Sequence, residues 1–464
     1  MAEAKFLRGN LFGHVTVMSL TASIGLMAVF IVDFVDMIFI SMLGKAELAA
    51  AIGYAGAILF FTASFGIGLG IAAGALVARA LGADDAELAR ERTTHALAYG
   101  FVIAVCLSTI VWLSLSGLVA LLGATGETAS LAVHFLQIIV PSMPFLIVGM
   151  MGSAVLRAHG DARRAMMATI AGGVVNAVLD PILIFGLDLE LTGAAISSVA
   201  ARLVICGMAL WPLITVYQGV ARPRLTGMLR DLGPILAIAI PTILAQVATP
   251  VGQAFVTRAM AGYGEEAVAG MAIVGRLIPV AFGVVFALSG AVGPIIGQNF
   301  GAGDMDRVRR SFNAGILFVG LVIISVSAVL FLARGAIADL FSAQGLTREL
   351  IYLFCGPLSL AFFFPGVLFV ANAAFNNLGK PFYSTFTNWG RNAVALIPLV
   401  MIGSWLGGAQ GVLIGQSLAG AVFGTVAWVL ALRVIDRASG SDIVPRQEIF
   451  GREGRLMTLF HARR

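Results

Sequence analysis

The nine residues Arg79-Ala-Leu-Gly-Ala-Asp-Asp-Ala-Glu87 recur in altered form as Gln298-Asn-Phe-Gly-Ala-Gly-Asp-Met-Asp306. Each stretch follows a long apolar run that contains spaced glycines. The same offset aligns Ala154-Val-Leu-Arg-Ala-His-Gly160 with Ala373-Ala-Phe-Asn-Asn-Leu-Gly379. A chain that repeats itself at half its length indicates two copies of one structural unit.

The composition indicates that most of this chain lies in a lipid bilayer. Of its 464 residues, 59% are hydrophobic and 11% are charged, whereas soluble proteins have about 45–50% apolar and about 25% charged residues. A helix that crosses a bilayer needs about 20 mostly apolar residues, and most of the chain is apolar enough to lie in lipid. The composition therefore excludes a cytosolic enzyme, a secreted domain and a nucleic-acid-binding protein.

The apolar runs predict an all-α integral membrane protein with twelve transmembrane helices. We expect these helices near residues 14–40, 48–78, 93–122, 131–158, 165–187, 192–216, 233–260, 267–298, 311–333, 351–378, 383–406 and 410–433. The odd-numbered loops hold only Lys45, Arg334 and Arg348, and nearly all other loop Lys and Arg residues fall on the opposite side. Since cytoplasmic loops carry the excess of Lys and Arg, both termini are predicted in the cytoplasm, in a multi-pass protein of the inner (plasma) membrane.

The repeat organises these helices into two lobes. We expect an N-lobe of helices 1–6 over residues 1–216, a cytoplasmic linker over 217–232, a C-lobe of helices 7–12 over 233–433 and a cytoplasmic tail over 434–464. Six spans in each repeat give both lobes the same orientation, related by a pseudo-two-fold axis along the membrane normal. This arrangement is typical of secondary transporters, which bind substrates between the halves.

Three carboxylates lie inside predicted spans, and such residues usually face a polar path. Asp33 and Asp36 share one face of the first helix, and Asn176 and Asp180 share one face of the fifth. Asp36, Asn176, Asp180 and Ser198 of the sixth helix are expected at similar depths in the outer half of the N-lobe. They form either an oxygen cage for Na⁺ or a proton site in which neighbouring carboxylates share a proton.

The C-lobe spans contain no carboxylate. Five of their polar residues are candidates for lining a substrate cavity: Gln246, Thr249, Gln253, Asn372 and Asn376. Asp33 of the N-lobe is a further candidate.

The sequence shows no machinery for other chemistry. Gly44-Lys45 and Gly379-Lys380 lack the glycine that a phosphate-binding loop carries five positions earlier. The five histidines are scattered, without metal-ligand spacing or a catalytic triad. We therefore expect neither an enzyme nor a cofactor, and an ion gradient of H⁺ or Na⁺ is the remaining source of energy.

Several segments together resemble the multidrug and toxic compound extrusion (MATE) family over nearly the whole chain. They are Val35-Asp-Met-Ile-Phe-Ile-Ser-Met-Leu-Gly44, Arg157-Ala-His-Gly-Asp161, Asn176-Ala-Val-Leu-Asp-Pro181, Gly193-Ala-Ala-Ile and Gly297-Gln-Asn-Phe-Gly-Ala302. The resemblance implies an antiporter that exports cationic or amphipathic compounds against inward H⁺ or Na⁺ flow by alternating access. It also implies a cation site at Asp36, Asn176, Asp180 and Ser198. The lack of C-lobe acids is more similar to the DinF-like than to the NorM-like branch.

The resemblance further implies small-molecule substrates, contact with membrane lipids and a monomer. The alternative is a flippase or exporter of lipid-linked oligosaccharides or metabolites from the same wider superfamily. Such a flippase would have a basic cavity for pyrophosphate, and the carboxylates in the N-lobe count against it.

Overall fold

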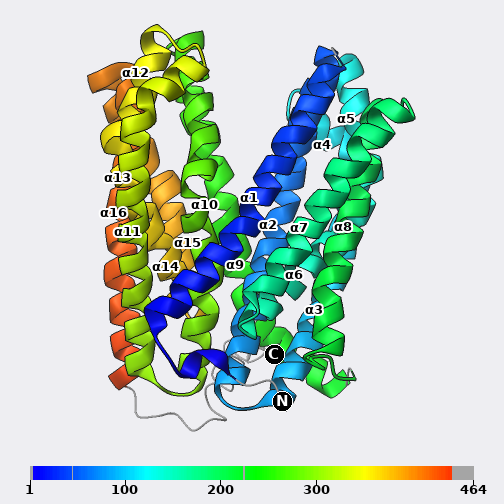
Figure 1. Cartoon of the computed structure of the whole chain (residues 1–464), viewed down its shortest axis with the longest axis vertical. Coiled ribbons are helices and arrows are strands. Elements are labelled where there is room, and N and C mark those ends of the chain that lie inside the picture. The colour runs from blue at the N-terminus through cyan, green and yellow to red at the C-terminus, as the bar shows by residue number, and fades with distance from the viewer. Residues whose placement is uncertain (1–3, 44, 223–224, 441–464) are drawn as a thin grey trace, which may run out of the picture. The chain divides into compact units, whose positions relative to one another are not determined.

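The computed structural model describes residues 4–43, 45–222 and 225–440, apart from the side chains of residues 33, 41, 46, 49, 225 and 440. This part of the chain is helical and contains no strand (Figure 1). The elements are η1 (Lys5–Leu7), α1 (Leu11–Met42), α2 (Ala46–Gly82), α3 (Ala86–Leu113), α4 (Leu115–Leu121), α5 (Gly126–Ile139), η2 (Val140–Ser142), α6 (Met143–Ala158), α7 (Ala162–Pro181), η3 (Ile182–Gly186), α8 (Glu190–Thr215), α9 (Leu225–Ala261), α10 (Glu265–Gly301), α11 (Met305–Leu340), α12 (Gly345–Leu353), η4 (Phe354–Leu358), α13 (Ser359–Ala361), α14 (Phe363–Asn377), α15 (Phe382–Trp389), η5 (Gly390–Ala395) and α16 (Leu396–Gly440).

Twelve spans account for these helices. Among the described residues, ten helical stretches are long and apolar enough to cross a membrane, and the bent pair Gly345–Ala361 and Phe363–Asn377 makes an eleventh. The stretch Phe382–Ser439 has 58 residues and would be about 87 Å long as one helix, against a hydrocarbon core of about 30 Å. Gly407 and Gly408 interrupt it with non-helical dihedral angles. The stretch is therefore two spans, and the predicted number of twelve is confirmed.

A tight helical hairpin joins these last two spans. Gly408 has a φ of +56°, which a glycine adopts without steric cost. A Cβ on Gly403 would lie 2.1 Å from the carbonyl oxygen of Gly411, so the two helices approach at backbone distance where both carry glycine. The last span continues to Gly440, beyond its predicted end at residue 433.

The repeated stretch of the sequence forms the same turn twice. Asp85 caps the N-terminus of α3 by accepting a hydrogen bond from the backbone N–H of Leu88, and Asp304 caps α11 through the N–H of Arg307. The preceding residue has a positive φ in both turns, +59° at Asp84 and +78° at Gly303. A carboxylate at this position satisfies a free N–H of the first helical turn, so the repeat preserves a helix start.

The chain divides into two compact units. Unit 1 consists mainly of Ile24–Ile243, and unit 2 contains Phe6–Ser23 together with the chain from Leu244 to the end of α16. The division falls inside α1 and inside α9, the first helix of each repeat. The predicted lobe and linker boundaries, which rest on the repeat and on loop charge, stay a prediction.

Glycines set the packing of α2, α3 and α6, which contact one another in unit 1 (Figure 1). A Cβ on Gly70 or Gly74 of α2 would meet the backbone of α6 at 3.4–3.5 Å, at Met150 and Ala154. The spaced glycines of this span therefore allow close helix packing.

Two prolines interrupt the fourth span, and side chains of α3 donate hydrogen bonds to the two carbonyls that lose their proline-position donors. Pro141 and Pro144 have no N–H to donate to the carbonyls of Gln137 and Val140. The indole N–H of Trp112 donates to the carbonyl oxygen of Gln137 (3.2 Å), and the hydroxyl of Ser108 donates to that of Val140 (2.7 Å). Trp112 and Ser108 are four residues apart and so lie on one face of α3.

Candidate cation site

The buried polar residues of α7 are the centre of the candidate site. Asn176 is 6% exposed and Asp180 is fully buried. Because the two lie four residues apart on one helix face, the side-chain amide of Asn176 donates to Oδ1 of Asp180 (3.2 Å). Pro181 follows directly, and the helix widens into the π-helical turn η3. Such turns are frequent at functional sites.

A hydroxyl from α8 completes this cluster. Ser197 is fully buried, accepts a hydrogen bond from the amide of Asn176 (3.1 Å) and contacts Oδ1 of Asp180 at short range. The carbonyl oxygen of Ala194 is also within hydrogen-bond distance of this hydroxyl (2.9 Å). Ser197 therefore has two alternative acceptors, a carboxylate and a backbone carbonyl.

Glycines bring α7 and α8 close enough for these contacts. A Cβ on Gly193 would lie 2.7 Å from the carbonyl carbon of Leu183 in η3, and one on Gly172 would lie 3.1 Å from the carbonyl oxygen of Ala201. Ser197 is one helical turn after Gly193 and so lies on the same face of α8. The Gly193-Ala-Ala-Ile motif thus has a packing function that places a hydroxyl beside Asp180.

The register of α1 against α7 places Asp36 at the level of this cluster. A Cβ on Gly173 would lie 3.0 Å from a methyl group of Val32, and the rings of Phe39 and Phe185 are 5.9 Å apart. Asp36 lies between these two contacts along α1, on the helix face that Val32 and Phe39 share. Asn176 and Asp180 lie between the same two contacts along the α7–η3 segment. Asp36 is partly buried.

The sequence reasoning predicted Ser198 for the site and missed its neighbour Ser197. Ser198 is partly exposed at the position after Ser197, and Ser197 is the hydroxyl that contacts Asn176 and Asp180. Two adjacent serines look alike in the sequence, but the spacing of four residues from Gly193 could have singled out Ser197. The side chain of Asp33 lies outside the described part of the structure.

The charge of Asp180 is only partly balanced by these contacts. Within the described part of the chain, Oδ2 of Asp180 is buried and has no hydrogen-bond partner. A buried carboxylate oxygen without a partner is costly unless it gains a proton or a cation. No group of three or more His, Cys, Asp or Glu residues that could hold a metal ion occurs among the described residues. The donor set here is instead carboxylate, amide and hydroxyl, which suits H⁺ or Na⁺.

The polar candidates of the second repeat separate into two groups within unit 2. The hydroxyl of Thr387 contacts Oδ1 of Asn372 (3.5 Å), and Ser384 donates to Oδ1 of Asn376 (2.9 Å). On α9, Gln246 is partly exposed and Thr249 is exposed. Gln253, also on α9, accepts a long contact from Gln416 of α16 (3.4 Å).

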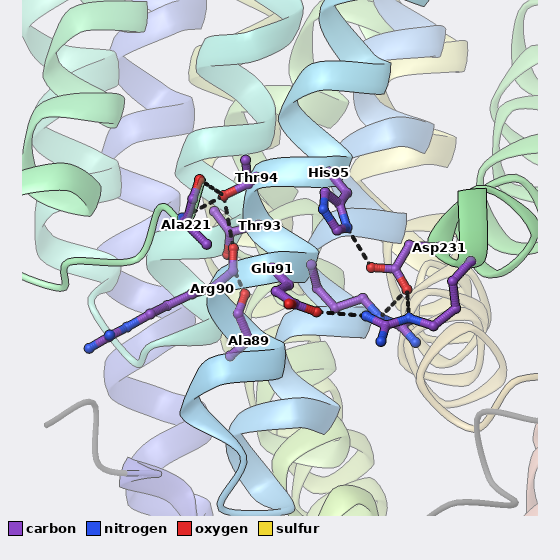
Figure 2. A network of polar contacts seen from close by, with 10 residues as sticks. Ala89, Arg90, Glu91, Thr93, Thr94, His95, Ala221 and Asp231 are labelled. Carbon is purple, nitrogen blue, oxygen red and sulfur yellow. Dashed lines mark hydrogen bonds and ion pairs between the residues drawn. The ribbon is translucent and has the colours of Figure 1, made fainter. Parts of the chain in front are cut away.

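A second buried network, which sequence reasoning missed, joins α3 to the start of α9 (Figure 2). Asp231 is fully buried, and its carboxylate contacts Nδ1 of His95 (2.7 Å), Nε of Arg92 (3.3 Å) and Nε of Arg230 (3.0 Å). Arg230 also pairs with Glu91 (2.7 Å). A Cβ on Gly227 would lie 2.8 Å from the His95 ring. These residues lie at the ends of predicted helices, where charged side chains are normally exposed to solvent. Their burial therefore becomes evident only from the tertiary packing.

The fold and the buried polar cluster define a multi-pass membrane protein with the architecture of a transporter. The family model MatE matches residues 22–182 and 241–402, one copy in each repeat. The chain belongs to the MATE family of transporters.

Relatives of this chain agree with that family. The FAD transporter of Shewanella oneidensis is 28% identical over 425 residues, which cover 90% of this chain and 94% of that protein. The multidrug export protein MepA of Staphylococcus aureus is 26% identical over 439 residues, covering 93% of this chain and 96% of MepA.

Solved structures show the same fold. The outward-facing structure of a multidrug resistance MATE family transporter has a TM-score of 0.87 at 22% identity, covering 94% of this chain and 99% of that chain. A mutant form of the Vibrio cholerae MATE transporter VcmN has a TM-score of 0.87 at 23% identity, covering 95% of this chain and 98% of that chain. The predicted class of two six-helix lobes is confirmed by these neighbours.

Proposed function

We propose that this protein is a secondary active efflux antiporter, which exports cationic or amphipathic compounds in exchange for H⁺ or Na⁺ by alternating access. One observation carries the proposal: a fully buried carboxylate, Asp180, is held by Asn176 and Ser197 and has one oxygen without a partner among the described residues. Asp36 lies at the same level on α1. The multidrug export protein among the relatives supports the substrate class.

The hydrogen bonds around Asp180 accommodate both protonation states. When Asp180 is ionised, the Ser197 hydroxyl donates to the carboxylate. When Asp180 is protonated, the same hydroxyl accepts from the acid and turns its proton to the carbonyl of Ala194, 2.9 Å away. A Na⁺ ion would instead bind to the free oxygen of Asp180 and to oxygens of Asp36 and Asn176. In this mechanism either cation neutralises the cluster without leaving the hydroxyl unpaired.

Neutralisation couples the two transported species. A negative cluster attracts a cationic compound, and bound H⁺ or Na⁺ removes that attraction. Coupling also requires the cation to bind the outward-open and inward-open states with different affinity. We place the protein in the inner membrane as a monomer with cytoplasmic termini. We also place it nearer to the DinF-like branch, because the spans of the second repeat carry no carboxylate.

Export of a metabolite is the second candidate function. The FAD transporter among the relatives matches over nearly the full length of both proteins, and FAD is amphipathic but anionic. This candidate uses the same coupling site and differs only in substrate.

Uptake of ethidium by inverted membrane vesicles, which corresponds to export from the cell, tests the proposed function. A pH gradient and a Na⁺ gradient are imposed separately. We expect one gradient to drive accumulation, and Asp180→Asn and Asp36→Asn to abolish it. Asp188→Asn is the matched control, because Asp188 is an exposed carboxylate of the same unit. Its positive φ of +54° is also tolerated by asparagine. Unchanged gradient-driven transport in a folded Asp180→Asn variant contradicts the proposal.

A further inference from the structure

Arg391 is a cation in the middle of a membrane span of the second repeat. The helical stretch begins at Phe382, so Arg391 lies about 14 Å from its start at 1.5 Å per residue, and a span that crosses a core of about 30 Å would carry it well inside the membrane. A charged side chain at this depth is rare and is normally paired or directed to a polar path.

Arg391 shares the shielded, polar side of its helix. It follows Thr387 by four residues and Asn388 by three, and both of these are buried. Phe386 and Val394, which are 49% and 69% exposed, mark the apolar side. Arg391 itself is only partly exposed. Its position therefore directs it away from the lipid-facing side of the span.

The guanidinium of Arg391 has no acceptor within the described part of the chain, where it makes no hydrogen bond, ion pair or ring contact. Arg202, another arginine inside a span, is satisfied by contrast, since it donates to the carbonyl of Ile139 (2.9 Å) and the hydroxyl of Ser142 (3.0 Å). All acidic residues of the described part of unit 2 lie near helix ends. A charge inside a membrane span is normally paired, and the donors of Arg391 fit a planar or tetrahedral anion.

A neighbouring amide offers a second donor. Oδ1 of Asn372 faces the hydroxyl of Thr387 (3.5 Å). Among the described residues, the amide nitrogen of Asn372 donates to none. Thr387 thus joins Asn372 of α14 to the helix face that carries Arg391.

The backbone that carries Arg391 is fixed by close packing. Arg391 lies in the π-helical turn η5 (Gly390–Ala395). A Cβ on Gly390 would overlap the Phe423 ring, and one on Gly252 would lie 2.9 Å from the carbonyl oxygen of Asn392. π-Helical turns often occur at functional sites, and this one is held between α9 and α16.

We propose that Arg391, with Asn372 and Thr387, binds a phosphate or carboxylate group of the transported compound. The inference rests on the proposed export function and adds amphipathic compounds that carry an anionic group to its substrates. The acidic cluster around Asp180 then binds the coupling cation, and the second repeat supplies the positive charge that recognises the anionic group of such a substrate.

Binding of FMN and riboflavin to the purified full-length protein tests this proposal, because the two flavins differ by one phosphate. We expect the wild type to bind FMN roughly tenfold or more tightly than riboflavin, the effect of one charge-assisted hydrogen bond or more. Arg391→Gln should remove the preference and leave riboflavin binding intact, and Arg391→Lys should retain part of it. Arg258→Gln, at an exposed position of unit 2, is the matched control and should retain all of it.

Three outcomes overturn the proposal. Equal affinity of the wild type for both flavins removes the anion site. An equal loss of both flavins in a folded Arg391→Gln variant gives the arginine a structural role only. In nanodiscs, a preference that disappears on adding phosphatidylglycerol assigns the guanidinium to a lipid headgroup. Gradient-driven ethidium transport by the wild type tests the export function separately, so each proposal can fail alone.

Discussion

Replacing Asp231 by asparagine should destabilise unit 1 strongly. Asp231 is fully buried, and its most deeply buried cationic partner, Arg92, has a side chain only 3% exposed. Loss of the carboxylate breaks a buried ion pair with this guanidinium, and breaking such a pair from one side costs about 3–5 kcal/mol in free energy of unfolding. The hydrogen bond to His95 (2.7 Å) is also weakened. Asparagine keeps the shape and one acceptor, so we expect a loss near the lower end, about 3 kcal/mol.

Replacing Arg230 should have a much smaller effect on stability than replacing Asp231. Arg230 contacts the same carboxylate at 3.0 Å, but its side chain is 55% exposed. Exposed ion pairs contribute about 0–1 kcal/mol, so Arg230→Gln should change stability by less than about 1 kcal/mol. The expected losses in free energy of unfolding therefore differ several-fold, because Asp231 and Arg92 are buried whereas the Arg230 side chain stays in contact with water.

Reversible unfolding in mixed detergent measures these differences, and thermal unfolding of the purified protein checks their order. The double variant with Arg92→Gln should recover part of the loss, because it also removes the buried positive charge that pairs with Asp231. If Asp231→Asn is as stable as Arg230→Gln, the buried network is not a net stabiliser and the reasoning from burial is refuted.

Three further predictions concern packing and pH. Gly193→Ala should cost about 1–3 kcal/mol and weaken Asp180-dependent transport, because its Cβ would lie 2.7 Å from the η3 backbone; Gly207→Ala on α8, with nothing within 4 Å, is the control, and equal unfolding temperatures would contradict the packing argument. Burial lowers the pKa of His159 from 6.5 to about 4, against an opposing effect of Asp161. The unfolded chain therefore takes up a proton first as the pH falls from about 6.5 to about 4, and the free energy of unfolding should drop by up to roughly 3 kcal/mol. His159→Gln should flatten that part of the stability–pH curve, and a curve of unchanged slope would refute the assignment. Ser108→Ala should cost about 1 kcal/mol by removing one of two donors to the carbonyl of Val140, the other being the backbone N–H of Met143, whereas loss of the exposed Thr109 hydroxyl should cost little; equal losses in thermal unfolding would show that the proline break does not depend on Ser108.

Much of the fold was predictable from local properties of the sequence. Apolar runs, loop charges and the duplicated turn each depend on neighbouring residues, so the twelve spans and two repeats follow without tertiary information. The same holds for Asn176 and Asp180, since a spacing of four residues on one helix places two side chains together. The sequence could not decide between Ser197 and Ser198, because that choice depends on the rotation of α8 against α7.

The membrane class, the repeat, the helix number and the intramembrane carboxylates were determined by the sequence alone, because hydrophobicity and turn chemistry act over short distances along the chain. Only the tertiary structure decided which polar groups are buried and what they contact. It placed Asp231 of α9 against Arg92 and His95 of α3, more than 130 residues away, and left Arg391 without an acceptor among the described residues. Desolvation and pairing depend on distances between helices that are remote in sequence, and no local pattern encodes them.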